Sequence, residues 1–135
     1  MTRSATVSLT EFLRQRGLWC FITLAWMAVI FYLSSVPYSG ELTELFLGDL
    51  NTLGRKIAHL TEYAILAVLC RKAGGPSRRS FVMAALIALT FAVTDEWHQV
   101  FVPGRGANPL DVMVDAAGIF LALWLMSFWK VRPPA

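Results

Sequence analysis

The sequence predicts an all-α membrane protein, a four-span transmembrane helical bundle. Hydrophobic residues make up 56% of the 135-residue chain, and only 16% of its residues are charged, against about 25% in ordinary soluble domains. The apolar residues are gathered into long runs, and one membrane span needs about 20 residues. The chain therefore accommodates a single domain of a few membrane helices, and no length is left for a separate soluble domain.

Four apolar segments predict the four spans, at roughly residues 18–36, 57–69, 81–100 and 110–129. The first follows basic residues, as the apolar core of a secretory signal does. It is longer than the 7 to 15 residues of such a core, however, and it ends without a small-residue cleavage motif. We therefore expect an uncleaved first helix after a cytoplasmic tail over residues 1–17, and a short interfacial helix over residues 8–16 is compatible with that tail.

The second segment is short as a purely apolar run. Basic pairs at 55–56 and 71–72 flank it, and it spans the membrane if His59 and Glu62 face protein rather than lipid. We predict that it does, so that residues 18–130 form one four-helix membrane domain.

The basic residues are divided unevenly between the two sides of this topology. Three fall on one side, namely Arg55, Lys56 and Arg105, and nine fall on the other. Because short membrane proteins keep their more basic side in the cytoplasm, we expect both termini there, in the cytoplasmic membrane of a bacterium. The positive net charge then reflects orientation, since the chain offers no basic and aromatic surface of the kind that binds nucleic acid.

Polar side chains gather near the outer boundary of three of the predicted helices, and helical periodicity places those of each helix on one face or its flank. The predicted site residues are Lys56, His59, Glu62 and Tyr63 on the second helix, Asp95, Glu96 and Gln99 on the third, Asp111 and Asp115 on the fourth, and Arg105 on the turn before it. An ionisable group within a membrane helix is costly and is by default a functional candidate. We therefore predict an outward-facing polar pocket built from the second, third and fourth helices.

The turn over residues 103–109 is rich in Gly and Pro, and Asn108 or Asp111 can cap the helix that follows. Arg105 is carried on this turn. We expect its side chain to fold back over the pocket, where a guanidinium can pair with a carboxylate or bind an anionic group through two parallel hydrogen bonds.

Four motifs follow one another in the chain. They are Phe31-Tyr32-Leu33-Ser34-Ser35-x-Pro37, Lys56-x-x-His59-x-x-x-Tyr63, Asp95-Glu96-x-x-Gln99-x-Phe101-x-Pro103-Gly104-Arg105 and Asp111-x-x-x-Asp115-x-x-Gly118. In their order and spacing, over roughly residues 31–121, the chain resembles the VanZ-like family of small bacterial membrane proteins. That family is named after a member associated with teicoplanin resistance, so the resemblance implies a cell-envelope role and an antibiotic phenotype, without implying an established reaction.

Three interpretations of the polar pocket remain open. In the first, Arg55, Lys56 and Arg105 provide cations for a phosphate or carboxylate, so that the pocket recognises or modifies the headgroup of a membrane lipid or lipid-linked cell-wall precursor and lowers glycopeptide binding. The residues assigned to ligand binding are Lys56, Tyr63, Gln99, Arg105, Asp111 and Asp115.

In the second interpretation the pocket is catalytic, with acid and base candidates at His59, Glu62, Asp95 and Glu96. A metal-dependent membrane hydrolase is one form of it, because His59 with Glu62 and Asp95 with His98 each place a carboxylate and an imidazole one helical turn apart. We assign no metal ligand and leave the cofactor open. In the third interpretation the polar groups form a buried network that only fixes helix packing. A homodimer is compatible with a bundle this small.

Overall fold

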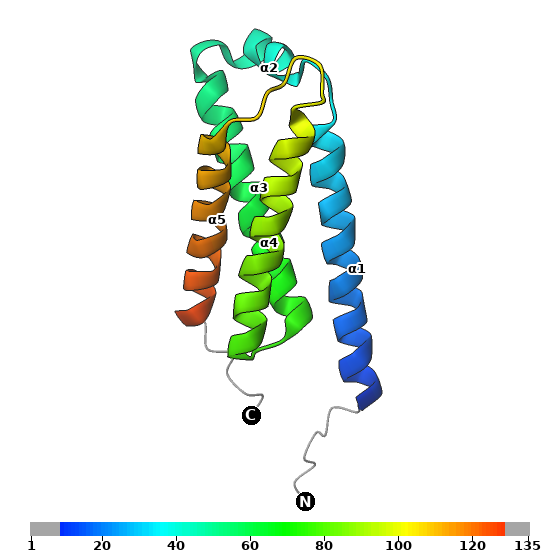
Figure 1. Ribbon diagram of the computed structural model, residues 1–135. Helices are drawn as coiled ribbons and strands as arrows, with labels where there is room; N and C mark the ends of the chain where they lie inside the picture. The colour runs from blue at the N-terminus through cyan, green and yellow to red at the C-terminus, as the bar shows by residue number, and fades with distance from the viewer. Residues whose placement is uncertain (1–8, 129–135) are drawn as a thin grey trace, which may run out of the picture.

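The computed structural model describes residues 9–128, and the regular structure in that range is entirely helical. The elements are α1 (Leu9–Ser34), α2 (Ser39–Leu47), the 3-10 turn η1 (Gly48–Leu50), α3 (Asn51–Gly74), α4 (Arg78–Gln99) and α5 (Pro109–Phe128). The four long helices run side by side in alternating directions, and α2 lies across one end of the bundle (Figure 1). We call that end the pocket end, and the opposite end, where α3 turns into α4, the turn end.

Three helices, rather than the predicted four, are long and apolar enough to cross a membrane: α1, α4 and α5. The four-span prediction is wrong on this count because charged residues enter α3 at both of its ends, with Arg55 near one end and Arg71 near the other. At 24 residues α3 is nevertheless as long as its neighbours. It contacts α1, α4 and α5, so it is the central helix of the bundle.

The outside of the bundle is apolar along its length. Phe21 and Leu24 on α1, Val93 on α4 and Trp124 on α5 are all more than half exposed. A soluble monomer rarely exposes so much contiguous apolar surface, whereas lipid tails solvate it. The three long apolar helices and this exterior are those of a membrane protein.

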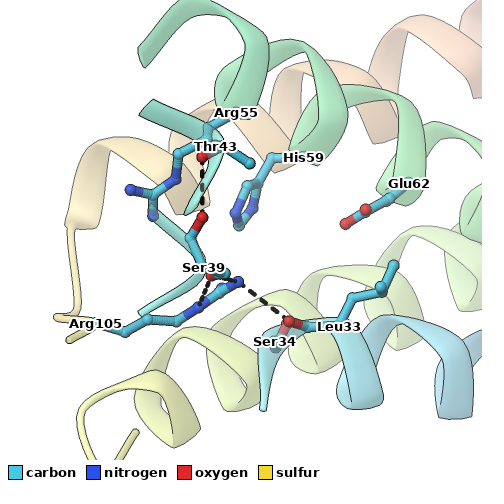
Figure 2. A pocket seen from close by; sticks show the side chains of 8 residues that line it. All are labelled: Leu33, Ser34, Ser39, Thr43, Arg55, His59, Glu62 and Arg105. Atoms are coloured by element: carbon cyan, nitrogen blue, oxygen red, sulfur yellow. Dashed lines mark hydrogen bonds between the residues drawn. The ribbon is translucent and has the colours of Figure 1, made fainter. Parts of the chain in front are cut away.

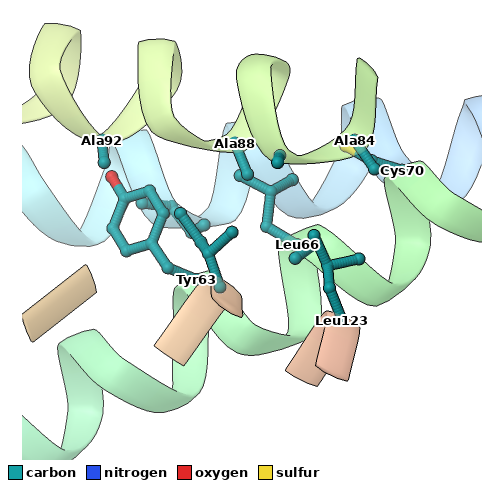
Figure 3. Packing of buried hydrophobic residues seen from close by; sticks show 11 residues of the cluster. Tyr63, Leu66, Cys70, Ala84, Ala88, Ala92 and Leu123 are labelled. Atoms are coloured by element: carbon teal, nitrogen blue, oxygen red, sulfur yellow. The ribbon is translucent and has the colours of Figure 1, made fainter. Parts of the chain in front are cut away.

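Small side chains let α3 and α4 pack closely. Ala84, Ala88 and Ala92 recur at intervals of four residues along one face of α4 and are almost fully buried. Figure 3 shows them above Tyr63 and Leu66 of α3. Without a hydrophobic driving force between helices in lipid, such close backbone approach is what stabilises helix packing.

The closest contact between α3 and α5 is at Gly118. A Cβ atom at Gly118 would lie 2.3 Å from the backbone oxygen of Leu60, so only glycine fits there. Asp115 lies one turn from Gly118 and His59 is next to Leu60, and the close approach therefore brings these two side chains together.

The helix limits differ from the predicted segments at α1 and at α2. α1 is one continuous helix from Leu9 (Figure 1), so the described part of the predicted interfacial segment is simply the start of α1. α2 has no counterpart among the predicted segments. The predicted cap of the last helix is confirmed, because the side-chain oxygen of Asn108 accepts a hydrogen bond from the Leu110 amide at 3.1 Å. Residues 1–8 and 129–135 lie outside the described residues.

Candidate functional site

The loop between α4 and α5 is packed onto the corner between α1 and α2. The Tyr38 amide donates a hydrogen bond to the Pro103 oxygen at 3.1 Å. Gly104 has a φ of +73°, and a Cβ atom there would lie 2.4 Å from the Tyr38 ring, so glycine is required for both conformation and space. These two contacts fix the position of the next residue, Arg105.

Arg105 folds back over the pocket end, as the sequence analysis predicted. Its Nε donates to the Ser39 hydroxyl at 2.9 Å, and its Nη2 donates to the Leu33 carbonyl oxygen at 3.1 Å. Its partners are thus a hydroxyl and a carbonyl rather than a carboxylate. Burial, and next the neighbouring Arg55 guanidinium, lower the pKa of Arg105 from its ordinary value.

Beneath Arg105 lies a pocket of about 100 Å³ (Figure 2). It is lined by Leu33 and Ser34 of α1, Ser39 and Thr43 of α2, Arg55, His59 and Glu62 of α3, and Arg105. This lining differs from the predicted site, which was built from the second, third and fourth of the predicted helices. Of these three helices only α3 lines the pocket, and α1, α2 and Arg105 provide the rest of its lining.

Arg55 reaches the pocket by lying against Gly40 of α2. A Cβ atom at Gly40 would be 2.9 Å from Arg55 Nη1, so the absence of a side chain leaves room for the guanidinium. Among the side chains that the structure describes, no carboxylate forms a salt bridge with Arg55 or Arg105. The pocket therefore holds two cations without an acidic partner in direct contact.

On the α3 wall, Nδ1 of His59 lies 3.2 Å from Oδ1 of Asp115 on α5. Asp115 is almost fully buried, at 1% exposed, and does not line the pocket, whereas 12% of the His59 side chain is accessible. Glu62 lies one turn farther along α3 and also lines the pocket. The Trp26 indole donates to the Glu62 backbone oxygen at 3.0 Å, which holds α1 against this part of α3.

Behind Ser34 is a sealed group of polar side chains that we call the buried network: Ser34, Asp95 and Gln99. Asp95 Oδ2 accepts hydrogen bonds from Ser34 Oγ at 2.7 Å and from Gln99 Nε2 at 3.2 Å. Asp95 and Gln99 are 3% and 1% exposed. These two predicted site residues therefore join α4 to the end of α1 and lie outside the pocket surface.

The remaining predicted site residues also lie outside the pocket lining. Glu96 is buried and accepts a hydrogen bond from the Asn108 amide. Tyr63 is fully buried, and its hydroxyl points toward Ala92 of α4 (Figure 3). Lys56 and Asp111 are half-buried, and neither lines the pocket. Of the adjacent basic pair, it is Arg55 that faces the pocket.

His98 points away from the pocket, toward α1. Its Nε2 lies 3.0 Å from Ser35 Oγ, and its ring stacks on Phe31 with 4.4 Å between ring centroids. The predicted pair on α3, His59 with Glu62, and the predicted pair on α4, Asp95 with His98, thus do not converge on one site. Within residues 9–128 no group of three or more His, Cys, Asp or Glu side chains is arranged to hold a metal ion.

Sequence reasoning missed Ser34, Ser39 and Thr43 as pocket residues. Ser34 belongs to the first of the four motifs, and that was the available signal. Ser39 and Thr43 had none, because their role depends on the unpredicted helix α2 turning back across the pocket end.

The motif resemblance noted above is supported independently. A family model described as VanZ/LLP1 matches residues 19–130, which cover all of α3, α4 and α5 and most of α1. No curated protein and no solved structure matches the chain.

Proposed function

The chain belongs to the VanZ/LLP1 family, and from that premise we propose that its pocket binds the anionic headgroup of a cell-envelope lipid or lipid-linked cell-wall precursor. The observation that carries this proposal is the pair of guanidinium groups, Arg55 and Arg105, which line one small pocket and form no ion pair with any described carboxylate side chain. Guanidinium groups bind phosphate and carboxylate through parallel, charge-assisted hydrogen bonds.

A hydroxyl group of the pocket suits the same ligand. Ser39 and Thr43 of α2 line the pocket, and the Thr43 hydroxyl donates to Asn51 Oδ1 at 2.6 Å. Ser39 is therefore the hydroxyl open to an anion, since hydroxyls donate to phosphate oxygens as readily as they accept from arginine. The Ser39 hydroxyl already accepts from Arg105 Nε, so its proton is free for an anion. Two cations and one hydroxyl then surround one oxyanion.

Pocket size narrows the class of ligand. One water takes about 30 Å³ of liquid, and a cavity of about 150 Å³ is known to hold a benzene ring. A pocket of about 100 Å³ therefore accepts a phosphate-sized group and is too small to enclose a glycopeptide. The rest of the ligand must remain outside the pocket, as the chains of a membrane lipid would.

The charge distribution suggests which side of the membrane the pocket faces. Six basic residues lie at or near the turn end: Arg14, Arg16, Arg71, Lys72, Arg78 and Arg79. By the positive-inside rule we infer that the turn end and both termini are cytoplasmic and that the pocket opens toward the outer leaflet. An effect on teicoplanin would then arise indirectly, through the headgroup of a cell-wall precursor, because the antibiotic is too large for the pocket.

The proposal is tested by lipid binding to the purified protein in detergent, measured by native mass spectrometry. The probes are phosphatidic acid, a polyprenyl phosphate and, as the neutral control, diacylglycerol with matched chains. We expect both phosphate lipids to bind at least 10-fold more tightly than diacylglycerol. Arg55→Gln and Arg105→Gln should each weaken binding about 10-fold, equivalent to about 1.4 kcal/mol for the loss of charge-assisted hydrogen bonds.

The matched control is Lys56→Gln, which removes an equal charge from the adjacent position outside the pocket and should change binding less than twofold. Inorganic phosphate is added as a competitor, to distinguish a lipid headgroup from the free anion as the ligand. Equal affinity for phosphatidic acid and diacylglycerol, or equal losses from Lys56→Gln and Arg55→Gln, would contradict the proposal.

A further inference from the structure

The contact between His59, in the pocket wall, and Asp115, behind it, is not needed for anion binding. His59 presents Nδ1 to Asp115 Oδ1 at 3.2 Å, and Asp115, at 1% exposed, has no access to the pocket. Since a carboxylate only accepts hydrogen bonds, the proton of a neutral His59 is held on Nδ1. The second ring nitrogen, Nε2, then carries a lone pair.

That lone pair is available to a ligand in the pocket. Nε2 of His59 makes no hydrogen bond to any other described residue, and Figure 2 shows the imidazole projecting into the pocket between Arg55 and Glu62. An imidazole oriented by a buried carboxylate and facing a binding site is the arrangement of a general base. It lies where the proposed function puts the phosphate group.

Resting on that proposed function, we propose that the pocket hydrolyses the phosphate ester that it binds, with His59 as the catalytic base and Asp115 as a positioning residue. The oxygen of a water molecule forms a bond to phosphorus while one water proton passes to His59 Nε2. The bond between phosphorus and the lipid oxygen breaks, and its electron pair stays on that oxygen, which takes a proton from the Glu62 carboxyl. His59 then returns its proton to Glu62, so the products are a lipid alcohol and phosphate.

The nucleophile in this reaction is water rather than Ser34. Ser34 lines the pocket, but its hydroxyl donates its proton to Asp95 Oδ2 at 2.7 Å and not to His59. The roles of the two arginines follow from the same geometry, because Arg55 and Arg105 hold the phosphate oxygens and stabilise the negative charge that they carry in the transition state.

The test uses the full-length protein in detergent with phosphatidic acid and polyprenyl phosphate as substrates, and measures released phosphate beside lipid binding. His59→Gln should lower the rate at least 100-fold, the lower range for losing an acid–base group, while binding changes less than twofold. Asp115→Asn should lower kcat about 100-fold or more and leave KM unchanged, because it disturbs the orientation and tautomer of the base. Asp115→Glu should recover part of that kcat.

The matched control is Thr61→Ala, on the exposed face of α3 between His59 and Glu62, where the hydroxyl bonds only to its own helix. Its rate should equal that of the unmodified protein. Tight lipid binding without phosphate release would overturn the hydrolysis proposal and leave the binding function standing. Absence of binding would instead overturn the proposed function. A full rate in His59→Gln would remove His59 from the reaction, and a raised KM with unchanged kcat in Asp115→Asn would overturn its positioning role.

Discussion

The pocket wall and the buried network are both polar and lie at the same end of the bundle, yet their groups differ in exposure and in partners. In the buried network Asp95 is 3% exposed and accepts hydrogen bonds from Ser34 and Gln99 through Oδ2, while its buried Oδ1 has no hydrogen-bond partner among the described residues. In the pocket wall Arg55 and Arg105 line open space and have no carboxylate in contact among the described side chains. Polar groups that bond to one another across helices fix a structure, whereas a charge without a counter-ion beside a cavity is available to a ligand.

This contrast assigns different roles to residues that the sequence alone placed in one set. The buried network joins α4 to the end of α1, and α1 carries Leu33 and Ser34 into the pocket. The network therefore acts on the ligand only through the shape of the pocket, and the two regions should respond differently to substitution.

The largest effect is expected at Gly118, on which both regions depend. Gly118→Ala would place a Cβ atom 2.3 Å from the Leu60 backbone oxygen, and since backbone cannot move aside easily, α3 and α5 must separate. We expect the free energy of unfolding to fall by about 3 kcal/mol, measured by steric trapping or thermal unfolding in detergent. The control is Gly17→Ala, another helical glycine with no atom within 4 Å of the added Cβ, which should change stability by less than about 1 kcal/mol. Equal effects at both sites would show that this contact does not limit helix packing.

The next effect separates the buried network from the pocket wall directly. Asp95→Ala leaves the Ser34 hydroxyl and the Gln99 amide buried without their shared acceptor, and should destabilise the protein by about 2 kcal/mol. Glu62→Ala removes a carboxyl whose side chain makes no hydrogen bond to a described residue and borders open space, and should change stability by less than about 0.5 kcal/mol. The same unfolding assay measures both variants. A reversed order would mean that Glu62, rather than Asp95, fixes the packing.

A third substitution acts on the pocket without removing any pocket side chain. In Gly40→Ala the new methyl group would lie 2.9 Å from Arg55 Nη1, at the flexible end of that side chain, so the guanidinium moves and the helices stay in place. Binding of phosphatidic acid should weaken about 10-fold, or about 1.4 kcal/mol, with unfolding unchanged. Gly106→Ala is the control, because no atom lies within 4 Å of its added Cβ. Unchanged affinity in Gly40→Ala would contradict a role of Arg55 in anion binding.

The sequence predicted those structural features that depend on residues close together in the chain. The apolar runs predicted the four long helices, and the Gly- and Pro-rich turn predicted that Arg105 folds back and that Asn108 caps α5. Motif order predicted the family. The polar stripe on α3 also correctly suggested that His59 and Glu62 face the inside of the protein, although its charges keep α3 from qualifying as an apolar span.

The walls of the pocket could not be predicted, because they depend on how helices are placed rather than on their periodicity. Helical angle places Asp95 and Gln99 on one face of α4, but it does not say whether that face meets a cavity or another helix. In the structure the end of α1 packs against Asp95 and Gln99, and α2 crosses the pocket end. No pattern in the sequence of α4 indicates either of these two contacts.

The smallest effect is expected at His98, which distinguishes a helix-packing histidine from a pocket histidine. His98→Phe keeps the ring that stacks on Phe31 and loses only the 3.0 Å contact with Ser35 Oγ. Since Ser35 also donates to the Phe31 backbone oxygen at 2.6 Å, no polar group is stranded. Stability should change by less than about 0.5 kcal/mol, and both phosphatidic acid binding and phosphate release should be unaltered, whereas His59→Gln should lower the rate of release at least 100-fold. Loss of phosphate release in His98→Phe would place the reacting group on the α1–α4 side of the bundle and reverse the assignment of the two regions.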